Sequence, residues 1–164
     1  MNTTAFTIYD ASAGSGKTYT LTKEYLKILF LATNDDAYRK ILAITFTNKA
    51  VEEMKTRIVS SLYQFSLDNT SDKAMELLKD VASETKLSIA TLKDKSKAII
   101  KNIIHNYAAF DISTIDKFTH KVIRTFAQDL NLPPNFEVSL ETDSLLQEAI
   151  DLVISKAGDD PNLT

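Results

Sequence analysis

The chain has 164 residues, of which 44% are hydrophobic and 25% charged, and it contains no cysteine. This composition is typical of a soluble globular chain, and the lack of cysteine excludes disulfide bonds and thiolate metal sites. The longest apolar stretches are too short to span a bilayer and the first residues do not form a signal peptide. We therefore expect a cytoplasmic protein that does not enter a membrane.

The net charge of −3 conceals a division along the chain. Residues 91–128 carry seven basic and three acidic residues, whereas residues 129–164 carry one basic and eight acidic residues. Clustered Lys and Arg side chains can bind nucleic-acid phosphates. A solvated helix face explains the same charges, and from charge alone we favour that simpler explanation.

The first half of the chain alternates predicted strands and helices. Residues 6–9 alternate in polarity and predict a short strand at about 5–10. A helix is predicted from about 17 to 31, and the continuous apolar run 41–46 predicts a strand buried in a parallel sheet. The residues expected on the buried face of the first helix are Leu21, Tyr25, Ile28 and Leu29.

A second helix is predicted to begin near Asn48, with Thr47 and Asn48 offering an N-cap. Further helices are expected within 68–90 and 91–107, followed by a strand at 111–115. The apolar faces expected after residue 48 comprise Ala50, Met54, Ile58, Leu62 and Phe65, then Ile99, Ile103 and Tyr107, then Phe118, Val122, Phe126 and Leu130. Thr142 is expected to cap a last helix with Leu145, Leu146, Ala149, Val153 and Ile154 facing inward.

The segment Ala11–Thr18 matches the Walker A pattern, with alanine in place of its first glycine. Glycines let backbone N–H groups point at phosphate oxygens, and the following helix directs its N-terminus at the same anion. Lys17 can reach the β- and γ-phosphates, and the Thr18 hydroxyl suits Mg²⁺. A glycine-rich turn that binds nothing is disfavoured because the motif lies between a predicted strand and a predicted helix. The residues expected to bind ATP and Mg²⁺ are Ser12, Ala13, Gly14, Ser15, Gly16, Lys17 and Thr18, with Lys17 and Thr18 also catalytic and Thr18 the Mg²⁺ ligand.

Two later segments carry a family resemblance. Residues 44–58 read Ile-Thr-Phe-Thr-Asn-Lys-Ala-Val-Glu-Glu-Met-Lys-Thr-Arg-Ile, and residues 112–118 read Ile-Ser-Thr-Ile-Asp-Lys-Phe. Together with the Walker A segment, their order resembles that of UvrD/Rep-type superfamily 1 DNA helicases. The form of the Walker A segment and the sequence around 126–136 are most similar to the RecB/AddA branch, the helicase–nuclease subunits of recombination repair.

The resemblance implies an α/β fold with a RecA-like P-loop NTPase core, incomplete here, and a parallel sheet. Residues 1–136 would be the N-terminal part of the ATP-binding domain, with 60–108 as a helical insertion, and 137–164 would start a further helical subdomain. It also implies contacts with single-stranded or duplex DNA, and a partner protein that is a nuclease or a helicase. The residues that the resemblance assigns to DNA are Thr45, Phe46, Thr47, Asn48, Thr114, Lys117 and Phe118. Taken alone, Phe46 and Phe118 read as core residues, and Thr47 and Asn48 as a helix cap.

The sequence departs from this family in four places. Ala11 replaces a glycine, Asp116 stands where a histidine is usual, and no glutamine precedes Gln64 to read adenine. No apolar strand ends in the Asp-Glu pair of a Walker B motif, and the later arginine-bearing motifs are also missing. We therefore expect an N-terminal piece of a longer helicase that binds nucleotide without hydrolysing it rapidly.

Two other interpretations remain open from the sequence. A complete small P-loop phosphotransferase has a suitable length, but Arg39, Arg57 and Arg124 are not clustered as a phosphoryl clamp requires. A nucleotide-binding module without catalysis would bind ATP and show no preference for DNA.

Overall fold

A computed structural model describes residues 6–9, 16–133, 135–137 and 141–156. The chain divides into two units, residues 1–118 and 119–164, which we describe separately. The first unit contains α1 (Lys17–Leu31), the short 3-10 helix η1 (Ala37–Lys40), β1 (Ala43–Thr45), α2 (Asn48–Ser66), α3 (Asp72–Thr85), α4 (Ile89–His105), η2 (Tyr107–Ala109) and β2 (Ile112–Thr114). The helix α5 (Ile115–Thr125) begins at the end of the first unit and continues into the second. The helix α6 (Thr142–Lys156) belongs to the second unit.

The two described strands form a parallel pair with the register Ala43 to Ile112, Ile44 to Ser113 and Thr45 to Thr114. Parallel strands need a long crossover connection, which α2, α3 and α4 supply. The predicted α/β class and parallel pairing are therefore confirmed, although each strand is only three residues long. Residues 60–108 are largely helical, as expected, and residue 60 lies inside α2. Their status as an insertion, and the domain boundary at 136, stay predictions.

Local chemistry explains where α2 and α4 begin. Thr47 has an extended backbone, and its hydroxyl oxygen accepts a hydrogen bond from the Ala50 N–H at 3.1 Å. Ser88 caps α4 in the same way, through a 3.1 Å bond from the Thr91 N–H. Each cap satisfies a backbone donor that has no partner within the helix. The predicted cap at the start of the second helix is therefore confirmed.

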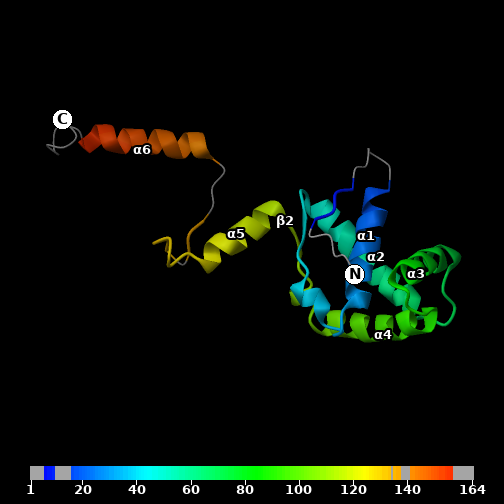
Figure 1. The fold of residues 1–164 in the computed structure, drawn as a ribbon. Helices are drawn as coiled ribbons and strands as arrows, with labels where there is room; N and C mark the ends of the chain where they lie inside the picture. Colours follow the sequence, from blue (N-terminus) through cyan, green and yellow to red (C-terminus); the bar gives the residue numbers. More distant parts are fainter. Residues whose placement is uncertain (1–5, 10–15, 134, 138–140, 157–164) are drawn as a thin grey trace. The chain divides into compact units, whose positions relative to one another are not determined.

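The core lies where α1, α2, α3 and α4 pack together, as Figure 1 shows. Tyr38 and Phe110 extend it toward the sheet, and their rings meet edge to face with centroids 6.5 Å apart. The expected face of α2 is largely confirmed, because Met54, Ile58 and Leu62 are buried. The largest fully buried side chains are Tyr38, Phe30, Phe65, Phe110, Leu26, Leu29, Ile58, Leu62, Leu78, Leu92, Ile99 and Ile103.

The buried face of α1 differs from the prediction. Leu21 and Ile28 are about half exposed, at 50% and 52%, and the buried residues are Thr22, Tyr25, Leu26, Leu29 and Phe30. Apolar residues lie on more than one side of this helix, so the sequence offers two possible stripes. Packing against the neighbouring helices selects the stripe with spacing i, i+3, i+4, i+7 and i+8. Thr22 fits inside because its hydroxyl donates to the Thr18 carbonyl at 2.8 Å.

Two other predicted features differ from the structure. Residues 6–9 form no strand, and Phe6 and Ile8 are 79% and 76% exposed, because no described strand pairs with this segment. Helix α4 ends at His105, so Tyr107 lies in η2 and is 48% exposed.

In the second unit, α5 ends at Thr125 and turns follow it. Among the described residues of this unit, Ala127 is the buried hydrophobic residue, and the rings of His120 and Phe136 lie 5.4 Å apart. The side chains predicted to face inward on α6 are exposed instead. An apolar helix face is buried only against another apolar surface, and sequence periodicity cannot show whether that surface is present.

Candidate functional site

The end of the Walker A segment lies at the start of α1. Gly16 is the N-cap and has φ 84° and ψ 17°, a left-handed conformation that residues with a Cβ rarely adopt. Its carbonyl accepts the Thr20 N–H at 2.9 Å, which closes the first turn of the helix. Ser12, Ala13, Gly14 and Ser15 lie outside the described residues. The described part therefore supplies a helix N-terminus, a lysine and a hydroxyl, as the motif requires.

A cleft of about 290 Å³ lies beside this turn. Gly16, Lys17, Thr18 and Tyr19 line it from α1, and Arg57 lines it from α2. The Arg57 guanidinium is held by Glu53 one turn earlier, through Nη2 and Oε1 at 2.7 Å. The cleft thus brings a lysine and an arginine from two different helices to the turn at the start of α1. Sequence reasoning did not assign Arg57 to this site, because the spacing along α2 does not show which neighbour its outer face meets.

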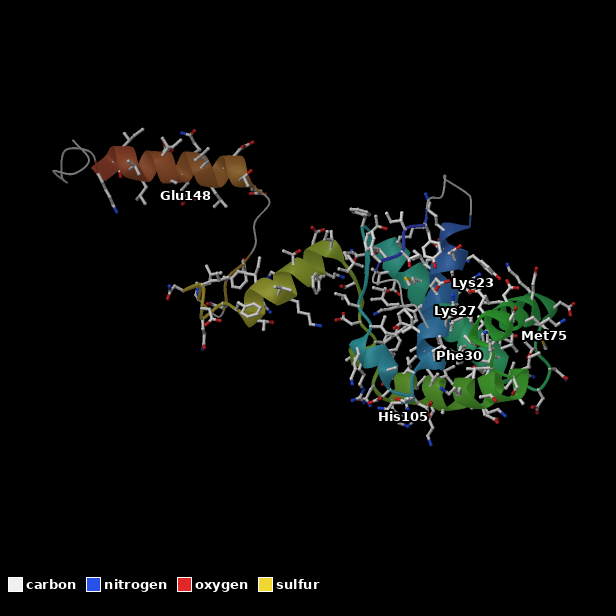
Figure 2. All side chains as sticks on the ribbon, viewed as in Figure 1. Lys23, Lys27, Phe30, Met75, His105 and Glu148 are labelled. Atoms are coloured by element: carbon white, nitrogen blue, oxygen red, sulfur yellow. The ribbon has the colours of Figure 1, made fainter. Side chains whose placement is uncertain are left out.

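Contacts with α3 fix the helix that carries the cleft. Lys23 and Lys27 on α1, both labelled in Figure 2, form ion pairs with Glu84 at 2.6 and 2.7 Å. These hydrogen bonds lower the pKa of the Glu84 carboxyl. Tyr19 donates its hydroxyl to Asp80 at 2.8 Å. Desolvation and then this hydrogen bond raise the pKa of Tyr19 to about 12, so the phenol stays protonated at neutral pH.

A second group of predicted residues meets at the carboxyl ends of the two strands. Thr45 pairs in register with Thr114, and α2 and α5 begin within three residues of these positions. The Thr114 hydroxyl accepts the Lys117 N–H at 3.3 Å, so Thr114 helps to start α5. The parallel register therefore places the segments 45–48 and 114–118 next to each other, although they are far apart in the sequence.

We call the segments 45–48 and 114–118 together the strand-end edge, and their side chains differ in solvent exposure. Phe46 is 85% exposed, so its interpretation as a core residue is wrong. Phe118 is half-buried, and Thr114 is buried. Thr47, Asn48 and Lys117 are exposed. The Phe46 ring is therefore accessible beside the first turn of α2.

Two lysines of the basic segment 91–128 have structural partners. Lys93 donates to the carbonyls of Leu67 and Asp68 at 2.8 and 3.1 Å, just after α2. Lys95 donates to the carbonyls of Phe30 and Ala32 at 2.7 and 2.8 Å, at the end of α1. Cations are favourable at helix C-termini, where carbonyl groups lack partners. The positive charges of Lys93 and Lys95 therefore stabilise the fold at these helix ends.

The described residues contain neither a membrane span nor a cluster of metal ligands. Within residues 6–9, 16–133, 135–137 and 141–156, no helix has the length and hydrophobicity needed to cross a membrane. The same ranges hold no group of three or more His, Asp or Glu side chains arranged to bind a metal ion.

Comparison with known proteins agrees with these features. Residues 3–163 match the family model of the UvrD/REP helicase N-terminal domain. The chain is 32% identical to one subunit of the ATP-dependent helicase/nuclease of Lactobacillus acidophilus, over 80% of this chain and 9% of that protein. The proteins of the same name from Streptococcus suis and Staphylococcus carnosus are 31% and 29% identical, over 88% and 92% of this chain and 10% of each of theirs.

No solved structure matches the chain. The chain spans about a tenth of the length of the relatives that it matches. The family model, in contrast, covers nearly all of the chain. The chain also carries the three sequence motifs, at residues 11–18, 44–58 and 112–118, in the order described above. The chain therefore belongs to the UvrD/REP helicase N-terminal domain family.

Proposed function

We propose that this chain is the nucleotide-binding segment of an ATP-dependent DNA helicase that acts in recombination and repair, and that it forms part of a P-loop NTPase core. The observation that carries the proposal is the cleft at Gly16, Lys17 and Thr18, formed at the N-terminus of α1. A helix N-terminus with a lysine beside it binds phosphate, and the Thr18 hydroxyl is a suitable Mg²⁺ ligand. Bound Mg²⁺ would neutralise phosphate charge. The names of the relatives, which combine helicase and nuclease, support the proposed helicase function.

We infer that the strand-end edge (residues 45–48 and 114–118) contacts single-stranded DNA. Thr47 and Asn48 can hydrogen-bond phosphate oxygens, and Lys117 adds positive charge. The exposed Phe46 ring can stack on a base without reading sequence. The carboxylate of Asp116 in the first turn of α5 opposes such binding, so we assign phosphate contact chiefly to the α2 side. In the whole protein, ATP hydrolysis would drive movement along the DNA strand. The whole protein would also act together with a partner protein that is a nuclease or a helicase.

The nucleotide part of the proposal is tested by titrating the chain with a fluorescent ATP analogue and Mg²⁺ while following ATP hydrolysis. Lys17→Ala should abolish binding, because it removes the phosphate contact, whereas Lys79→Ala on the exposed face of α3 should leave affinity unchanged. We expect little hydrolysis, since the chain has no Walker B carboxylates. Equal binding by the Lys17 variant and the native chain would exclude the site. Rapid turnover would favour the small phosphotransferase, which family membership does not support.

The DNA part is tested by fluorescence anisotropy with a labelled oligothymidylate at low salt. Phe46→Ala should weaken binding by roughly 1–3 kcal/mol if the ring stacks on a base. Because the ring is exposed, the same change should alter the free energy of unfolding by less than about 0.5 kcal/mol. Tyr63→Ala is the control, since Tyr63 is a 53% exposed aromatic residue near the other end of α2. Equal affinities for the two variants would exclude a role for Phe46.

A further inference from the structure

A seam of polar contacts joins α1 to α3 and reaches the cleft at the start of α1. Its members, each one turn from the next along its helix, are Tyr19, Lys23 and Lys27 on α1 and Asp80 and Glu84 on α3. Both helices advance by one turn from the Tyr19 contact to the Lys23 contact, so they run in the same direction along the seam. The hydrogen bond from Tyr19 to Asp80 is the member of the seam that lies at the first turn of α1.

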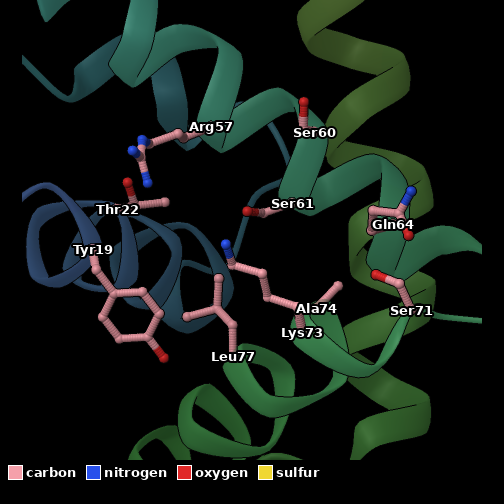
Figure 3. A pocket seen from close by; sticks show the side chains of 10 residues that line it. All are labelled: Tyr19, Thr22, Arg57, Ser60, Ser61, Gln64, Ser71, Lys73, Ala74 and Leu77. Carbon is pink, nitrogen blue, oxygen red and sulfur yellow. The ribbon is translucent and has the colours of Figure 1, made fainter. Parts of the chain in front are cut away.

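Tyr19 also stands between two hollow spaces. One is the cleft at the start of α1, and the other is a cavity of about 280 Å³ between α1, α2 and α3, whose lining side chains Figure 3 shows. Tyr19 and Arg57 line both spaces, so these two side chains lie where the spaces meet. The position of the Tyr19 ring therefore sets the boundary of the cleft on this side.

Asp80 holds the Tyr19 ring from outside the cleft. The Tyr19 residue is 39% exposed, so packing alone leaves its side chain room to turn. Its hydroxyl donates to Oδ2 of Asp80 at 2.8 Å, and a hydrogen bond to a charged acceptor is stronger than one to a neutral group. Asp80 is not among the side chains that line the cleft, so it can influence a ligand there only through its charge or through Tyr19.

We propose that Asp80 is a positioning residue of the nucleotide site, which holds the Tyr19 ring as a side wall of the cleft so that a bound triphosphate meets a preformed surface. The inference rests on the proposed nucleotide-binding function and adds α3 to the elements that shape the site. Ordering one loose side chain during binding weakens affinity by roughly two- to tenfold, and an anchored ring avoids this loss. No sequence motif pointed to Asp80, because it lies 61 residues beyond Tyr19.

The charge of Asp80 acts in the opposite direction from its hydrogen bond. A carboxylate repels the phosphates of a nucleotide, so removal of the charge by itself would tighten binding. Asparagine at position 80 removes the charge and keeps an oxygen that accepts the Tyr19 hydroxyl, whereas alanine removes both. A comparison of Asp80→Asn with Asp80→Ala therefore isolates the anchoring of the ring from the charge.

The experiment titrates the native chain and its variants with a fluorescent ATP analogue and Mg²⁺. Asp80→Ala should bind roughly two- to tenfold more weakly than Asp80→Asn. In a Tyr19→Phe background, which lacks the hydroxyl, the difference between these two variants should vanish, because Asp80 acts through that hydroxyl. Glu84→Ala is the control, since it breaks other contacts of the same seam and its partners Lys23 and Lys27 do not line the cleft, so the affinity should stay native.

Urea unfolding of the same variants separates positioning from stability. Asp80→Ala and Glu84→Ala should both lose stability, because each loses contacts across the seam, and of these two only Asp80→Ala should bind more weakly than Asp80→Asn. Equal affinities of Asp80→Asn and Asp80→Ala, with binding that still requires Lys17, would overturn the inference and leave the nucleotide site intact. Equal losses of affinity in Asp80→Ala and Glu84→Ala would also overturn it, since affinity would then follow the stability of the seam. Binding that does not depend on Lys17 would overturn the proposed nucleotide site itself, and this inference with it.

Discussion

Replacing Thr47 by alanine separates the structural role of the α2 N-cap from its proposed role in DNA binding. The Thr47 hydroxyl accepts the Ala50 N–H at 3.1 Å, and the side chain is otherwise exposed. Alanine removes this acceptor and little buried surface. Loss of such a cap costs about 1 kcal/mol, within a range of about 0.5–2. For a chain of this size, that corresponds to a fall in Tm of about 2–4 °C.

A matched control is present in the same unit. Ser88 caps α4 through the same kind of bond at the same length, 3.1 Å, and it lies outside the strand-end edge. Ser88→Ala should therefore cost a similar free energy of unfolding. Thr47→Asn should restore most of the stability, because asparagine is a good N-cap residue.

Urea unfolding followed by circular dichroism gives the stability of all three variants, and anisotropy with an oligothymidylate gives their DNA affinity. We expect Thr47→Ala and Ser88→Ala to be destabilised alike, and only Thr47→Ala to bind DNA more weakly. An unchanged unfolding midpoint for Thr47→Ala would refute the cap. Equal DNA affinity for the two alanine variants would refute the proposed contact at Thr47.

Two further predictions concern the packing of α1 and α2. Glu84→Gln should cost about 0.5 kcal/mol at pH 7 and low salt, the scale of partly exposed ion pairs. The pKa of Glu84 is lowered from 4.5 in the folded chain, so the stability that its carboxylate contributes is present above pH 4.5 and is lost as the pH falls through the folded pKa. Acid titration of the native chain and the variant by circular dichroism should therefore show the stability difference between them disappear. Ile58→Ala should cost about 2–5 kcal/mol in urea unfolding because Ile58 is fully buried, whereas Ile44→Ala, at a 43% exposed position, should cost much less. Similar losses at positions 58 and 44 would contradict the assigned core.

The sequence predicted those features that depend on local chemistry. The strands near 43–45 and 112–114 follow from short apolar or β-branched runs, and the start of α2 follows from the capping threonine. The parallel pairing follows from a helical connection too long for a hairpin. The placement of segments 45–48 and 114–118 side by side follows in turn, because parallel strands end at the same edge.

Features that depend on a tertiary partner could not be predicted in this way. Leu21 and Thr22 are adjacent on α1, and only the packing of α2 and α3 decides that the threonine is buried. Phe46 follows an apolar strand and so reads as core, although its ring is 85% exposed. Arg57 appears in the sequence as one unclustered arginine, and only the fold brings it to the cleft of Lys17.

Helix α2 contributes to both proposed binding sites, which limits how the variant data can be interpreted. Thr47 precedes its first turn, and Arg57 lies roughly 15 Å further along the helix axis, at 1.5 Å per residue. Loss of a cap frays the first turn, while Met54 and Ile58 stay packed in the core and hold the later turns in place. Thr47→Ala should therefore leave ATP affinity unchanged. If it weakens both DNA and ATP binding, the helix moves as a whole, and a loss of DNA affinity could no longer be assigned to one side chain.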